Sequence, residues 1–176
     1  MASAVTKLAT LTPSGTSTAT FSGISGSYDD LKIIGSVKGD WTSGWGSAVT
    51  AFYIQFNGDT ATNYLHLTND QTGTTVGAVG QNSWSSYYLY AVASSFGSNT
   101  GWGHFEMYLP GYKVTTAEKR IQGIAGYTQG TNESQSNNGH GSWFNTPSAI
   151  TDILFGLNYG DYVAGSTFTL YGITNS

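Results

Sequence analysis

The chain has 176 residues and no cysteine, which excludes disulfide scaffolds, thiol chemistry and cysteine metal sites. Only 9% of its residues are charged, the net charge is −4, and six scattered Lys and Arg residues form no basic stripe, which argues against nucleic acid as a partner. No apolar run approaches the roughly 20 residues of a membrane helix, and the first residues lack the basic start and apolar region of a signal peptide, so we expect synthesis in the cytoplasm and no membrane partner.

Alternation of apolar and polar residues predicts strands along most of the chain, and helical periodicity is rare. A short N-terminal arm, residues 1–12, is expected to precede a domain over residues 13–176. The predicted strands are 17–21, 31–37, 49–56, 64–68, 84–91, 103–109, 120–127, 149–157 and 167–173.

Clusters of Gly, Ser, Asn and Asp separate the predicted strands. Two longer polar segments, 70–83 and 128–141, read as exposed loops within one domain. Pro110 marks a corner, because proline cannot donate to a sheet ladder. The fold class predicted from this pattern is all-β: a single-domain antiparallel β-sandwich, jelly-roll-like.

The segment around Asn57 could hold a turn or a calcium ion. Asn57 and Gly58 form the dipeptide that most readily adopts a tight hairpin turn. Asn57, Asp59 and Asn63 also stand at relative positions 1, 3 and 7 of a calcium loop, but position 12 is Thr68 where such a loop needs a bidentate Glu. The pattern therefore favours a turn in which Asp59 bonds its own backbone.

Three histidines are the remaining candidate metal ligands. His66 and His104 read as outward residues on strands, and no two histidines have the close spacing of a metal pair. We expect no metal and no cofactor. His140, in a predicted loop tip, is the histidine expected to meet a partner.

Acidic residues that could catalyse glycoside hydrolysis are few. Asp29 and Asp30 are adjacent and would point to opposite faces of a strand, and Glu106 lies within a predicted strand. A solvated strand position is the better interpretation of Glu106, so we expect a protein that is not an enzyme.

Aromatic residues in Gly-rich connections are the strongest binding candidates. Trp41, Trp45 and Trp143 could either cover the end of the sandwich or contact a glycan or protein partner, since exposed rings provide much contact area at low entropic cost. For Trp84 and Trp102, covering the sandwich is favoured. The candidate partner-binding residues are therefore Trp41, Trp45, His140 and Trp143.

Several segments together resemble a group of small virion proteins of tailed bacteriophages, common in cyanophages. The resemblance spans most of the chain from about Leu8 onward, and the Trp41 to Trp45 segment does not match the group's pattern. It is carried by Phe21-x-x-Ile24 with Tyr28-x-Asp30-Leu31, by Ile54-x-Phe56-Asn57-Gly58-Asp59-Thr60 with Asn63-Tyr64, by Phe105-x-x-Tyr108-Leu109-Pro110-x-Tyr112, and by Ala149-Ile150-Thr151 with the closing residues 165–173.

The resemblance implies a context and carries no site residue. Such modules occur on capsid surfaces and in tail appendages. A single domain without heptads or shaft repeats favours a non-enzymatic capsid decoration (cement) protein on the virion, bound to the major capsid protein or another virion protein. A homotrimer is expected, because three-fold lattice positions suit it. The alternatives are a tail-fibre or receptor-binding module contacting host glycan, and a polysaccharide-degrading enzyme.

Overall fold

The computed structural model describes residues 4–41, 49–72, 75–94, 101–129, 133–145 and 148–175, and within these ranges the regular elements are all strands. In chain order they are β1 (Ala4–Leu11), β2 (Thr18–Phe21), β3 (Asp30–Gly39), β4 (Val49–Phe56), β5 (Tyr64–Thr72), β6 (Thr75–Trp84), β7 (Tyr87–Ser94), β8 (Gly103–Leu109), β9 (Lys119–Gln129), β10 (Glu133–Trp143), β11 (Ile153–Leu157) and β12 (Thr167–Thr174).

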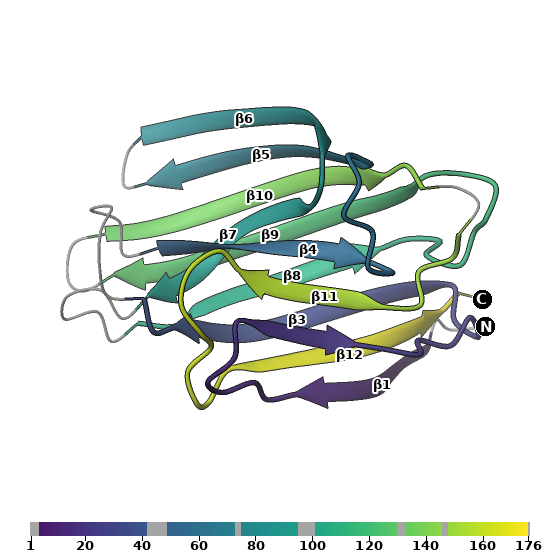
Figure 1. Ribbon diagram of the computed structural model, residues 1–176, viewed down its shortest axis with the longest axis horizontal. Coiled ribbons are helices and arrows are strands. Elements are labelled where there is room, and N and C mark those ends of the chain that lie inside the picture. Colours follow the sequence, from purple (N-terminus) through teal and green to yellow (C-terminus); the bar gives the residue numbers. More distant parts are fainter. Residues whose placement is uncertain are drawn as a thin grey trace.

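The described strands form two facing sheets. The larger sheet has the order β1-β12-β3-β8-β9-β10-β5-β6, and the smaller one has the order β2-β11-β4-β7. Figure 1 shows the smaller sheet in front of the larger one. The pairings are antiparallel except where Lys38 and Gly39 of β3 meet Ala93 and Ser94 of β7 and join the sheets. The prediction of an all-β antiparallel sandwich is confirmed.

The core between the sheets is built around Phe155 of β11. Its ring contacts Phe52 of the smaller sheet and two rings of the larger sheet, with centroid distances of 5.8 Å to Phe105 and 4.8 Å to Phe168. All four side chains are buried. Rings from both sheets therefore interdigitate, and this burial of apolar area is the main stabilisation expected for a chain without disulfides.

Glycines on the inner face of the larger sheet make room for these rings. A Cβ at Gly35 would overlap the Phe105 ring, and Gly35 and Phe105 are direct partners in the pairing of β3 with β8. Tyr87 of the smaller sheet lies over Gly139 and Gly141 of β10 in the same way. The glycines thus fix where the rings of the core can sit.

Three predicted segments differ from the structure. The expected N-terminal arm contains β1, which pairs with β12 and forms one edge of the larger sheet, so residues 4–11 belong to the sandwich. The two expected loops contain β6 and β10, and β10 lies between β9 and β5. Their Gly- and Asn-rich composition suggested loops, because the sequence does not show which side chain packs over each glycine.

Two strand starts also differ, for local reasons. The strand expected from residue 149 begins at Ile153, because the Asn57 side chain accepts hydrogen bonds from the backbone of Thr151 and Asp152 and holds them out of the sheet. The strand expected from Trp84 begins at Tyr87. β6 extends to Trp84, and Ser83, with a positive φ of 61°, lies where the register between β6 and β5 shifts.

Replacing Gly35 by alanine tests the role of glycine in the core. We expect Gly35→Ala to lower the free energy of unfolding by roughly 1–3 kcal/mol, because the new methyl overpacks a ring that Phe52 and Phe168 hold in place. Gly26→Ala, in the turn before β3, is the control. A Cβ there meets nothing within 4 Å, so we expect equal or slightly higher stability in urea denaturation. Equal effects of the two changes would contradict this account.

Candidate functional site

The outer face of the larger sheet carries side chains in rows across the strands. Strand register makes Glu106 of β8 the partner of Ile34 on β3 and of Ile124 on β9. Ile124 pairs in turn with Asn138 on β10, and Asn138 with Asn69 on β5. We call these five residues the central row. Because facing residues in a sheet project to the same side, the whole row points away from the core.

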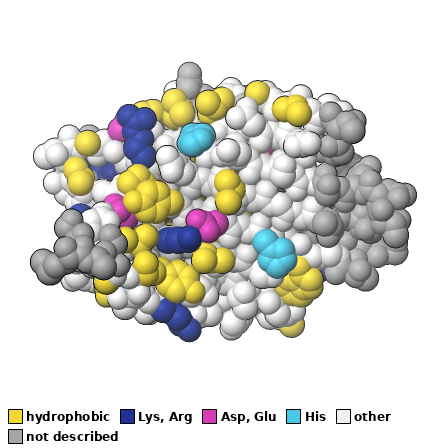
Figure 2. All heavy atoms as spheres, turned by 180° about the vertical axis from the view of Figure 1, so that it is seen from behind, with side chains coloured by type: hydrophobic (Ala, Val, Ile, Leu, Met, Phe, Trp, Pro, Cys, Tyr) yellow, Lys and Arg dark blue, Asp and Glu magenta, His cyan; other side chains and the backbone are white. Residues whose placement is uncertain are grey.

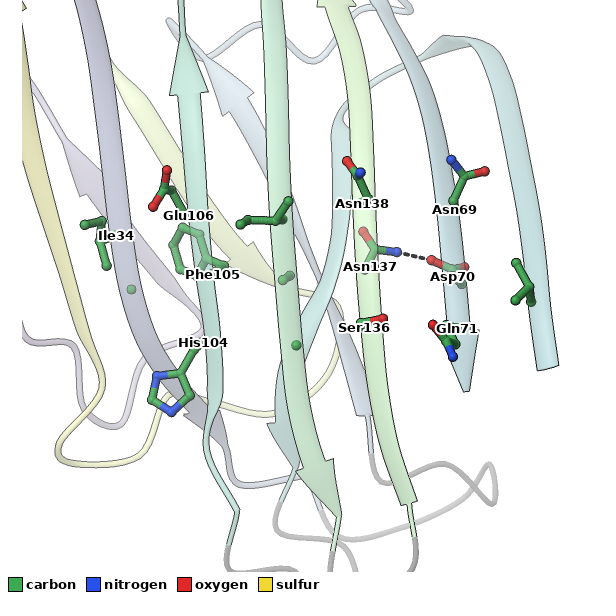
Figure 3. A pocket seen from close by; sticks show the side chains of 15 residues that line it. Ile34, Asn69, Asp70, Gln71, His104, Phe105, Glu106, Ser136, Asn137 and Asn138 are labelled. Atoms are coloured by element: carbon green, nitrogen blue, oxygen red, sulfur yellow. Dashed lines mark hydrogen bonds between the residues drawn. The ribbon is translucent and has the colours of Figure 1, made fainter. Parts of the chain in front are cut away.

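A groove runs along this face. Its volume is about 670 Å³, within the range of small-ligand sites. Figure 3 shows Ile34, Glu106, Asn138 and Asn69 from neighbouring strands side by side along it. Next to the central row lies a second row in register, whose members are His104, Gly126, Ser136, Gln71 and Val76.

The groove surface is mainly uncharged. Ile34 and Ile124 are 42% and 56% exposed, although both lie within long strands. Figure 2 shows this side of the molecule, with hydrophobic side chains scattered over a mostly uncharged polar surface and few charges. Gly126 has no side chain at the middle of the second row, which keeps the groove floor open.

The charged groups in the groove have local partners. Glu106 forms an ion pair of 2.8 Å with Lys32, and both side chains are partly exposed. Asp70 of β5 accepts a hydrogen bond from Asn137, drawn as a dashed line in Figure 3, and burial raises the pKa of its carboxyl. Asp70 follows Asn69 in an extended strand, so its side chain lies on the opposite face from the central row.

His140 extends this surface toward the chain termini. A smaller hollow of about 190 Å³ shares Glu106, Ile124 and Asn138 with the groove and also contacts His140, which is exposed. His140 lies on β10, where a loop tip was expected, yet its side chain is open to a partner. Among the predicted candidates it is the residue that the structure brings beside the groove.

The Trp143 prediction needs correction. Its side chain is fully buried, in contact with the rings of Phe56 and Tyr64, and its Nε1 donates a 2.7 Å hydrogen bond to Asp59. It is therefore a core residue with no surface to offer a partner. Sequence reasoning placed it in a loop because β10 was not recognised as a strand.

Of the other four tryptophans, three lie away from the groove and one falls outside the described residues. Trp41 is half-buried at one end of the sandwich, with its ring 4.8 Å from that of Tyr159, which is exposed. Trp45 falls outside the described residues. Trp84 and Trp102, expected to cover the sandwich, are half-buried against Tyr88 and Gly165.

The Asn57 to Asn63 segment is a structural turn. Asn57 and Gly58 have positive φ angles of 53° and 66°. Burial alone would raise the pKa of Asp59, but hydrogen bonds from Asn63, Trp143, the Ala61 amide and Asn145 outweigh it and lower the pKa. Since N–H donors surround this carboxylate, it already has partners in place of a cation.

The structure also corrects the predicted orientation of His66. It was predicted to point outward, but it is fully buried among the rings of Trp84, Tyr87 and Tyr88, whereas its neighbour Leu67 is 45% exposed. A shift of one residue in the assumed alternation places every side chain of a strand on the opposite face. Within the described ranges, no group of three or more His, Cys, Asp or Glu side chains could hold a metal ion.

Sequence reasoning missed most of the groove. The outward position of Ile124 could be read from the alternation Ile121, Gly123, Ala125 on the inner face of β9. Asn138 and Asn69 could not be placed, because one lay in a predicted loop and the other beyond the predicted end of its strand. Their alignment with Glu106 depends on the pairing of β10 with both of its neighbours.

Comparison with known proteins gives no relative: no family model, no curated protein and no solved structure matches the chain. In the part of the chain that the structure describes, no helix is long and apolar enough to cross a membrane. The assignment of function therefore depends on the groove and on the sequence resemblance.

The buried His66 predicts a pH dependence of stability. Burial lowers its pKa to about 4, although a backbone hydrogen bond with Tyr88 opposes the shift, whereas an unfolded histidine titrates near 6.5. Between these values the unfolded chain binds the extra proton, so stability is present above about pH 6.5 and is lost as pH falls toward 4.

We expect urea denaturation to show roughly 1–2 kcal/mol less stability at pH 5 than at pH 7.5. His66→Gln should lose most of this dependence, while His104→Gln, at an exposed position, should keep it. An unchanged pH profile in His66→Gln would contradict the assignment.

Proposed function

We propose that this chain is a non-enzymatic structural protein of a bacteriophage virion, in the first place a capsid decoration (cement) protein, and that the outer groove is its partner-binding surface. The resemblance of its strand and turn motifs to small virion proteins supports the context. The groove supports the mode of action, since it offers a broad open surface on a rigid sheet.

The single observation that carries the binding role is the composition of the central row. Two exposed isoleucines flank Glu106 on adjacent strands, and two asparagines continue the row. Protein interfaces are depleted of charge at their centre, and solvent-exposed apolar side chains on a sheet face are a common mark of a contact site. We therefore expect another protein to cover this surface.

The spacing of the carboxylates supports a non-enzymatic role. Glu106 projects from the outer face and Asp70 from the inner face, and their strands β8 and β5 are separated by three strand spacings, or about 14 Å. Glycosidases hold their two carboxyl groups about 5–5.5 Å or about 6.5–9.5 Å apart. The Asp70 carboxyl is also bonded to Asn137.

A host glycan is the second candidate ligand. Asn69, Gln71 and Asn138 line the groove, and each amide side chain can donate and accept hydrogen bonds, as sugar hydroxyls require. In that case the protein would act in a tail fibre or receptor-binding assembly. The cement role remains the first proposal, because the exposed isoleucines favour a protein surface.

Copy number in purified particles tests the proposal. Quantitative mass spectrometry of virions that carry this chain should give a constant ratio to the major capsid protein that fits lattice positions. A copy number that matches the tail appendages would favour the receptor-binding alternative. Absence from purified particles would overturn the virion role.

A groove variant tests the binding surface. Ile124→Asp should weaken binding to particles by roughly 30-fold, or about 2 kcal/mol, because it places a charge at the centre of the contact. Val114→Asp is the control, since Val114 is also exposed but lies outside the groove. Occupancy would be measured by pelleting with particles, after thermal melting has shown both variants to be folded. Equal occupancy would count against the groove.

A further inference from the structure

The free edges of the sandwich differ in how they are protected. An unpaired strand edge exposes backbone N–H and C=O groups and invites pairing with another chain, so proteins protect edges with charge, bulges or short strands. At one edge of the larger sheet, β1 carries Lys7 and an irregular register between Lys7 and Ala9. The outer strand of the smaller sheet, β2, has only four residues.

The other edge of the larger sheet lacks these protections. β6 contains neither proline nor any charged residue over its ten positions. Its register with β5 is regular from Thr75 to Gln81, and the irregularity comes only toward Trp84. Within the described residues, β5 alone pairs with β6, and Figure 1 shows β6 at the margin of the sheet. Val76 on this strand is 71% exposed.

We propose that β6 pairs antiparallel with β6 of a second copy of this chain, around a two-fold axis near Ala78. The occupant is a second copy because ten uncharged positions make this edge complementary to itself when two copies of β6 meet in antiparallel register. Such an isologous contact brings no like charges together along its length. The prediction does not depend on the proposed virion function.

The pairing would also join the two binding surfaces. Asn69, the last member of the central row, is the partner of Ala78 in the pairing of β5 with β6. The row therefore ends at the contact, and in the dimer it continues into the row of the second copy. The expected unit is a dimer, because a two-fold contact closes with two copies. A trimer formed through the two edges of the larger sheet would instead need the unlike edges β1 and β6 to meet.

Charge exchange at Ala78 tests this pairing. Sedimentation equilibrium at micromolar concentration should give a dimer for the wild type. Ala78→Lys and Ala78→Glu alone should each weaken association at least tenfold by like-charge repulsion, and an equimolar mixture of the two should recover the dimer. Val5→Lys, an exposed position on the opposite edge, should remain a dimer.

A measurement on the wild-type protein tests the same pairing even if a variant misfolds. In the wild type, amide hydrogen exchange in residues 75–81 should slow as concentration rises, while exchange in β1 should not change. A monomeric or trimeric wild type, or variants that still form dimers separately, would overturn the proposal. Particle occupancy that is normal in Ala78→Lys would leave the proposed virion function standing on its own.

Discussion

The packing of aromatic rings against glycine is the constraint on which the rest of the structure depends. The larger sheet has glycine at inner positions where aromatic rings take the place of a side chain. Phe105 of β8, Tyr87 of the smaller sheet and Tyr28 of the segment before β3 fill the space over Gly35, Gly141 and Gly172. Close packing of this kind tolerates little change in volume. It lets a chain rich in glycine and poor in charge form a dense core, and it sets which face of each strand points outward.

This constraint also explains what could be predicted from the sequence. Strands with aliphatic and aromatic alternation were predicted well, and the bounds of β4 and β8 agree with the structure. β10 was missed because its inner positions are Asn137, Gly139 and Gly141, a composition typical of loops. Gly139 and Gly141 fit a buried strand because the ring of Tyr87, more than 50 residues earlier, packs over them. Local patterns cannot contain a contact of that range, and the same limit hid Trp143 in the core.

The candidate site follows from the same register. Because glycines and rings face inward on β3, β8 and β10, the alternating positions Ile34, Glu106 and Asn138 face outward and align across the strands. Few charges occur on that face, and those in the groove are paired or bonded. The core beneath therefore fixes which residues face outward and how they align across the strands.

The central claim is that the outer face of the larger sheet is the binding surface, and footprinting on particles tests it most directly. Hydroxyl-radical labelling of free and particle-bound protein should show reduced labelling of Ile34, Ile124, His104 and His140 in the bound state. Tyr159, exposed at one end of the sandwich, should be labelled equally in both states. Protection of Tyr159 with unchanged labelling of the outer face would contradict the account and place the contact at the end of the sandwich.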